Sequence, residues 1–130
     1  MNMNFSMYSF NIFSVQLGFN CVYGCEVDEK LCKMSNEIAF EKLKLSPKEI
    51  KFINKYSTKL KDSDFDLENH QNDGKVDVIV TELFDSSFFG ERVASCLIHA
   101  IEKFLKPGGI VIPSSAKLRF SVIFRAVDFM

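Results

Sequence analysis

A short run of apolar, mostly β-branched residues, VDVIV at Val76–Val80, places the strongest limit on the fold of this chain. Such a run is typical of a parallel strand covered on both faces, because the side chains that point to either face must then be apolar. Parallel strands need crossover connections, which are usually helices. We therefore expect an α/β fold with helices packed on both faces of a sheet.

The rest of the chain alternates between strand and helix patterns, as this fold requires. Apolar residues recur at helical spacing over residues 93–105, which predicts a helix that stops at Pro107-Gly108-Gly109. A second amphipathic helix is expected from about residue 31 to Ser46-Pro47, and residues 11–17 read as the end of a helix that stops at Gly18. Further strands are predicted at residues 21–25, 50–56, 110–112 and 118–127. This order favours a doubly wound sheet.

Composition and charge limit the class of protein. The chain has 130 residues, enough for one small domain, and its net charge of −1 argues against a direct nucleic-acid binder. Residues 1–25 carry no charge, but polar residues interrupt them too often for a membrane span or a signal peptide. An apolar start of this kind is expected of a chain cut within a buried core. The four cysteines show no CxxC spacing, so we expect reduced thiols, no metal site, and a cytoplasmic or nuclear location.

Polar residues follow three of the predicted strands. They are Glu26, the pair Ser57-Thr58, and Glu82. In α/β sheets ligands bind outside the carboxyl ends of the strands, so these residues predict a binding site. An acid at the position of Glu26 can accept hydrogen bonds from both hydroxyls of a ribose. The alternative is a charge at a helix N-terminus, a role that Asp28 and Glu29 can also fill.

The segment TELFDSSFFGE, from Thr81 to Glu91, carries the most specific chemical signal. Glu82 directly follows a buried strand, Glu91 stands at the start of the long helix, and Gly90 allows a turn before it. Two carboxylates held close together are costly without a cation between them, and a guanidinium suits such a space because it donates hydrogen bonds on several sides. The alternative is a solvated loop acid and an unrelated acid at a helix N-terminus.

This segment resembles the double-glutamate loop of protein arginine methyltransferases. Three other stretches are similar to parts of that family: VYGCEVDE at 22–29, INKYST at 53–58, and LIHAIEKFLKPGGIVIPSSAKL at 97–118. The LFD at residues 83–85 resembles the type III branch, which monomethylates its substrates. The resemblance implies an incomplete class I methyltransferase sheet, Rossmann-like, over residues 1–113. It implies the start of a β-barrel domain over residues 114–130.

By the same resemblance, the cofactor would be S-adenosylmethionine and the substrate an arginine-containing protein. Glu26 would hold the ribose, and Ser57 and Thr58 would flank the adenine. Glu82 and Glu91 would clamp the guanidinium as catalytic residues, with Asp85 as a further substrate contact. Pairing with a second methyltransferase domain is also expected.

The chain departs from the family's pattern at its start. The family has a glycine-rich loop upstream of the residue that corresponds to Asn11, but residues 1–10 contain no glycine. We therefore expect the 130-residue chain alone to be inactive, with residues 4–13 as the only candidate for the central strand. Two alternatives to an enzyme fragment remain. One is a non-catalytic truncated isoform or partner of a full-length methyltransferase, and the other is a class I methyltransferase with a different substrate, which the double-glutamate spacing disfavours.

Overall fold

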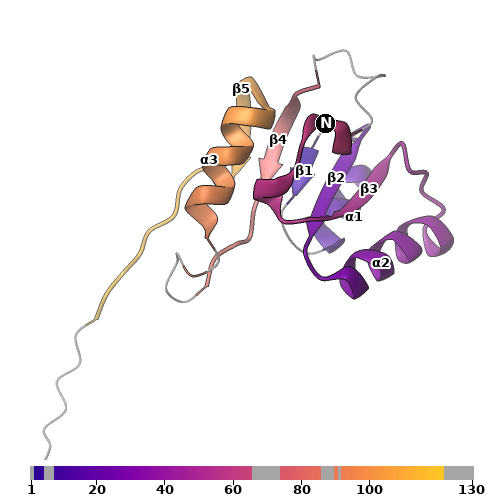
Figure 1. The fold of residues 1–130 in the computed structure, drawn as a ribbon, viewed down its shortest axis with the longest axis horizontal. Helices are drawn as coiled ribbons and strands as arrows, with labels where there is room; N and C mark the ends of the chain where they lie inside the picture. Colours follow the sequence, from indigo (N-terminus) through magenta and orange to yellow (C-terminus); the bar gives the residue numbers. More distant parts are fainter. Residues whose placement is uncertain (1, 5–7, 66–73, 86–89, 91, 122–130) are drawn as a thin grey trace, which may run out of the picture.

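The computed structural model describes residues 2–4, 8–65, 74–85, 90 and 92–121. Within these residues the backbone forms a five-stranded sheet in the order β3-β2-β1-β4-β5, and every pair of neighbours is parallel (Figure 1). The strands are β1 (Asn2–Asn4), β2 (Val22–Glu26), β3 (Ile50–Asn54), β4 (Val76–Val80) and β5 (Leu105–Ile112). The predicted parallel sheet is confirmed, so all five strands end at one edge.

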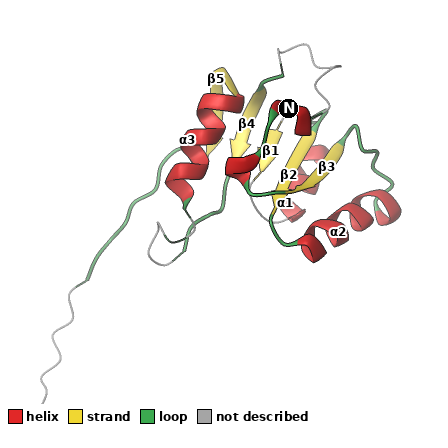
Figure 2. Cartoon of the chain, in the orientation of Figure 1, coloured by secondary structure: helices red, strands yellow, loops and turns green. Residues whose placement is uncertain are grey.

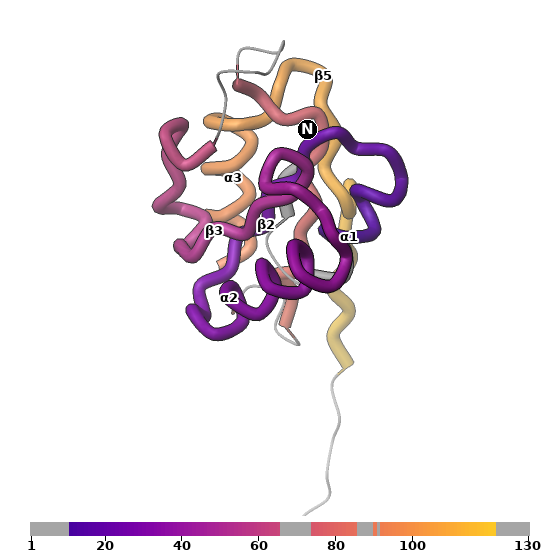
Figure 3. The backbone as a smooth tube through the Cα atoms, turned by 90° about the vertical axis from the view of Figure 1, so that its right-hand side faces the viewer, coloured from indigo at the N-terminus to yellow at the C-terminus, as the bar shows by residue number. Residues whose placement is uncertain are grey.

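Helices lie on both sides of the strands (Figures 1 and 2). On one face α1 and α2 pack against β2 and β3, and on the other α3 packs against β4 and β5; Figure 3 shows α1 and α3 on opposite sides. The helical elements are α1 (Tyr8–Gln16), α2 (Glu29–Glu37), the π-helical turn η1 (Ile38–Lys42), the 3-10 turns η2 (Ser57–Lys59) and η3 (Asp62–Asp64), and α3 (Val93–Phe104). Among the described residues, none of these helices is long and apolar enough to span a membrane.

The alternating side chains of β2 divide the core into two clusters. Val22 belongs to the cluster under α2, together with Ile50 and Phe52. Tyr23 belongs to the cluster under α3, which also contains Phe104. Both sets are buried, as expected for a parallel strand with helices on each face.

The central strand comes from the N-terminal residues. Asn2 of β1 pairs with Val22 on one side and with Val78 on the other. The expectation that residues 4–13 would fill this position is wrong, because Tyr8–Gln16 forms α1. Parallel neighbours need a crossover between them, and α1 is the crossover from β1 to β2. The predicted end of this helix at Gly18 is confirmed, since Gly18 takes a φ of 92°.

The last strand, β5, begins earlier than predicted. The preceding helix, α3, ends at Phe104, and β5 starts at Leu105 rather than after Pro107-Gly108-Gly109. Leu105 lies opposite Val76 and Ile110 lies opposite Val78, so the register shifts between them. Proline cannot donate a hydrogen bond to the sheet, and Gly108 takes a φ of 76°, which together favour a bulge in the strand.

The strand predicted over residues 118–127 does not form at residues 118–121, which have no regular structure. Residues 122–127 lie outside the described part of the chain. The start of a β-barrel is therefore not seen, and a domain boundary between residues 113 and 114 stays a prediction.

We expect the substitution Phe104→Ala to destabilise the fold strongly. Phe104 is 1% exposed, and its ring centroid lies 5.0 Å from that of Phe65 and 5.5 Å from that of His99. Removal of a buried phenyl ring typically lowers the free energy of unfolding by about 3–5 kcal/mol. Urea denaturation would measure this loss. The matched control is Ile101→Ala on the same helix, because Ile101 is 42% exposed and should change stability much less. Equal losses in the two variants would contradict the placement of α3.

Candidate active site

A cavity of about 630 Å³ opens where β2 and β3 end. It is lined by residues 25–27 after β2, residues 55–58 after β3, Leu83, and Gly90, Arg92, Ser95 and Cys96 near the start of α3. The predicted cofactor-binding residues Glu26, Ser57 and Thr58 all line this cavity. The structure thus brings together side chains that are far apart in the sequence, while their role in binding stays a prediction.

Glu26 is half-buried at the end of β2. Its Oε1 accepts a hydrogen bond of 2.9 Å from the backbone N–H of Asp28. Asp28 in turn caps α2, because its Oδ1 accepts a bond of 2.9 Å from the N–H of Leu31. Asp28 caps this helix and Glu29 supplies an acidic charge in its first turn. These two residues therefore fill the role of helix N-terminal charge that was the alternative for Glu26. This leaves the second carboxylate oxygen of Glu26 outside the bond to Asp28.

The segment after β3 is held in place by one partly buried carboxylate. Asp64 forms an ion pair with the ammonium group of Lys55, and its Oδ2 accepts a bond of 2.9 Å from the backbone N–H of Lys61. Burial alone would raise the pKa of Asp64, but these hydrogen bonds and charges outweigh it and lower the pKa below its usual value. Lys55 lines the cavity two residues before Ser57, so Asp64 positions the segment that carries Ser57 and Thr58.

Two thiols also line the cavity, Cys25 from β2 and Cys96 from α3. The Sγ of Cys25 donates a hydrogen bond of 2.8 Å to the backbone oxygen of Lys55. Burial, followed by the nearby charge of Glu26, raises the pKa of the Cys25 thiol to about 12. Cys25 is therefore a protonated donor that joins β2 to the segment after β3, and it is a poor nucleophile.

The loop after β4 contains the predicted substrate residues. Glu82 and Asp85 are exposed, and neither lines the 630 Å³ cavity, although Leu83 between them does. The Oδ1 of Asp85 accepts a bond of 3.2 Å from the backbone N–H of Gly90, which closes the loop. A Cβ atom at position 90 would lie 1.8 Å from Oδ2 of Asp85, so any other residue would displace this carboxylate.

Glu91, the second member of the predicted clamp, lies outside the described residues, as do residues 86–89. Whether Glu82 and Glu91 share a cleft, with Asp85 at its mouth, thus stays a prediction. What the structure does establish is that the loop's two ends are close together, because Asp85 bonds to Gly90.

Some residues of the cavity were missed by sequence reasoning. Tyr56 is 65% exposed and lines it beside Ser57, and Arg92 lines it from the N-cap of α3, with a φ of 60° and no side-chain capping bond. Tyr56 precedes the predicted residue Ser57, and Arg92 follows the predicted residue Glu91. This adjacency was the only sequence signal that could have indicated them as site residues. In the described part of the chain, no three His, Cys, Asp or Glu side chains form a group that could hold a metal ion.

We expect Asp64→Asn to destabilise the chain at neutral pH and to have little effect in acid. The pKa of Asp64 is lowered in the folded state, so its contribution is present above the pKa of the unfolded state and is lost as the pH falls through the folded pKa. The loss at neutral pH should be at most about 1 kcal/mol, as for other ion pairs near a surface. Urea denaturation at several pH values would measure it. Asp62→Asn is the control, because it removes the same charge from an exposed side chain of the same 3-10 turn.

Comparison with known proteins gives partial matches in sequence. The chain is 30% identical over 108 residues to protein arginine N-methyltransferase 6 of Xenopus tropicalis, which covers 83% of this chain and 28% of that protein. It is 47% identical over 45 residues to an arginine N(omega)-methyltransferase of Streptomyces achromogenes, which covers 35% of this chain and 12% of that protein. No protein-family model matches. The longer match thus spans only about a quarter of its curated relative.

The fold has a counterpart among solved structures. A crystal structure of a candidate methylase from Haemophilus influenzae superposes with a TM-score of 0.60 and covers 91% of this chain and 72% of its own, at 17% identity. At this identity the match concerns the fold alone, and it fits a class I methyltransferase sheet. Both relatives named here are arginine methyltransferases, and the structure with the matching fold is that of a candidate methylase.

Proposed function

We propose that this chain is part of a protein arginine methyltransferase, which uses S-adenosylmethionine to methylate a guanidinium group of an arginine-containing protein. One observation carries the proposal: Glu26, Ser57 and Thr58 converge on one cavity at the carboxyl edge of a parallel sheet. This is the edge at which α/β sheets bind nucleotide-like ligands. The names of the curated relatives support the same reaction.

The residues present fit the nucleoside end of this cofactor. The second carboxylate oxygen of Glu26 can accept hydrogen bonds from ribose hydroxyls, because only Oε1 is used by Asp28. The exposed ring of Tyr56 offers a flat apolar surface for an adenine, next to Ser57 and Thr58. Asp64 and Cys25 hold this segment through Lys55, so the nucleoside end would meet a preformed wall.

The methionine end of the cofactor has weaker support. It would lie beyond the end of β1, and residues 5–7, which connect β1 to α1, are outside the described residues. Residues 1–10 contain no glycine, and glycine is the residue that lets backbone come close to a ligand. We therefore propose that the chain holds the nucleoside end and does not position the methyl group for transfer.

The acceptor would be held by the loop after β4. When bound, the cofactor supplies an electrophilic methyl group. Glu82 and Glu91 would orient one guanidinium nitrogen and hold its positive charge while a proton leaves. Asp85 keeps the two ends of this loop together through Gly90. Monomethylation as in the type III branch, location in the cytoplasm or nucleus, and pairing with a second methyltransferase domain belong to the same proposal.

The substitution Glu26→Gln should weaken binding of S-adenosylmethionine by about tenfold or more, because a hydrogen bond to a charged group is lost. Isothermal titration of the purified chain would measure the dissociation constant. Glu29→Gln is the matched control, since Glu29 lies three residues away but does not line this cavity. If both variants bind the cofactor as tightly as the native chain, the ribose role of Glu26 is excluded.

Methyl transfer from S-adenosylmethionine to an arginine-rich peptide should be undetectable for the chain alone. A misplacement of about 1 Å can cost on the order of a hundredfold in rate, and a missing glycine-rich turn should cost more. A radiometric assay with labelled cofactor would measure the transfer. Turnover would show that residues 1–10 position the methyl group after all. Complete absence of cofactor binding would instead favour a non-catalytic partner of a full-length methyltransferase.

A further inference from the structure

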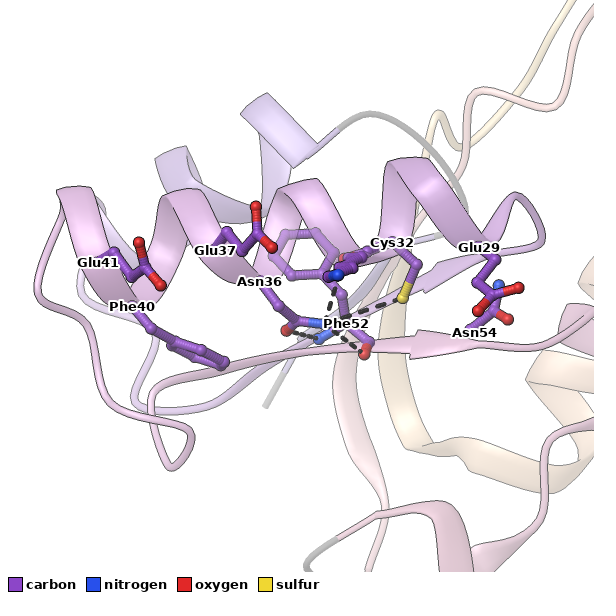
Figure 4. A pocket seen from close by; sticks show the side chains of 9 residues that line it. Glu29, Cys32, Asn36, Glu37, Phe40, Glu41, Phe52 and Asn54 are labelled. Atoms are coloured by element: carbon purple, nitrogen blue, oxygen red, sulfur yellow. Dashed lines mark hydrogen bonds between the residues drawn. The ribbon is translucent and has the colours of Figure 1, made fainter.

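A second cavity, of about 560 Å³, lies between α2, η1 and the edge strand β3 (Figure 4). We refer to it as the α2–β3 groove. Figure 4 shows Asn36 and Phe40 pointing from the helix toward β3, with Glu29 beside Asn54 at one end and Glu41 at the other. The groove is lined by Cys32, Asn36, Phe40, Phe52 and Asn54, together with Glu29, Lys33, Glu37 and Glu41.

The backbone of β3 is already occupied where it faces this groove. The side-chain amide of Asn36 donates to the carbonyl oxygen of Phe52 at 3.2 Å, and its Oδ1 accepts from the N–H of Phe52, also at 3.2 Å. An incoming strand could not use these two groups, so strand addition at Phe52 is disfavoured. A ligand of the groove must therefore be recognised by side chains.

Those side chains combine carboxylates with phenyl rings. Three carboxylates line the groove against one ammonium group, that of Lys33. Within the described residues, none of the three carboxylates is in an ion pair, whereas Lys55 and Lys106 each have an acidic partner. Glu37 and Glu41 are four residues apart, a spacing at which like charges repel along a helix. A cation in the groove would relieve this repulsion.

We propose that the α2–β3 groove docks a basic, arginine-rich segment of the acceptor protein. A guanidinium can lie flat on a ring such as that of Phe40 while it donates hydrogen bonds to carboxylates at the sides. This inference rests on the proposed function, because it takes the acceptor to be an arginine-containing protein. The docked arginines would be separate from the one that is methylated.

The groove also reaches the cofactor cavity. The Nδ2 of Asn54, at one end of the groove, donates bonds of 3.0 Å to the backbone oxygens of Glu26 and Val27. Both of these residues line the 630 Å³ cavity. An acceptor segment docked in the groove would therefore lie next to residues that line the proposed cofactor cavity.

The test is binding of a fluorescent arginine-rich peptide to the purified chain, followed by anisotropy. The double variant Glu37→Gln with Glu41→Gln should weaken binding by on the order of tenfold. The control, Asp62→Asn with Glu102→Gln, removes the same charge outside the groove and should change affinity less than about twofold. Phe40→Leu keeps an apolar side chain but removes the ring, and should also weaken binding. Circular dichroism would confirm that each variant is folded.

The outcomes separate the groove from the proposed function. Weaker binding in the groove variants, with no binding of a peptide in which glutamine replaces arginine, supports the groove. Equal weakening of peptide binding in the control pair would mean that only the net charge of the chain matters. Absence of peptide binding by the native chain would mean that the groove is not a docking site. Either result overturns the inference. A parallel titration with S-adenosylmethionine tests the proposed function separately, and the groove variants should leave that affinity unchanged.

Discussion

The whole sheet depends on one short central strand of three residues. β1 consists of Asn2–Asn4, and it is the only described strand that joins β2 and β3 to β4 and β5. The two halves carry different helices, α1 and α2 on one and α3 on the other. The candidate active site needs both halves, because Glu26 comes from β2 and Arg92 from the start of α3. The pairing of β1 on both sides therefore sets the geometry of the cavity.

Much of this fold could be predicted because its elements have apolar patterns of their own. The run at Val76–Val80 and the stripe along α3 are both seen where they were expected. β1 could not be located in the same way. Its sequence, Asn-Met-Asn, has no strand pattern, and it is held by backbone hydrogen bonds, which any residue except proline can make. The start of β5 was missed because Pro107-Gly108-Gly109 looks like a stop, whereas it forms a bulge.

The candidate site was predictable to the extent that it depends on the ends of strands. Glu26 and Ser57 follow parallel neighbours, and the carboxyl ends of parallel strands meet at one edge. Tyr56 and Arg92 could not be found this way, because their place in the cavity depends on a 3-10 turn and on the entry to a helix. The same limit applies to Asp64, whose ion pair with Lys55 spans nine positions that contain two short 3-10 turns. Such contacts follow from tertiary packing and leave no periodic signal.

The amide of Asn36 has a consequence for how this sheet can grow. It saturates Phe52 on the β3 edge, while β5 forms the opposite edge among the described residues. A position whose donor and acceptor are already paired cannot template another strand. The β5 border is interrupted in another way, because Pro107 has no backbone donor and the bulge disturbs the ladder. One side-chain amide thus takes the place of a neighbouring strand at the middle of the β3 edge.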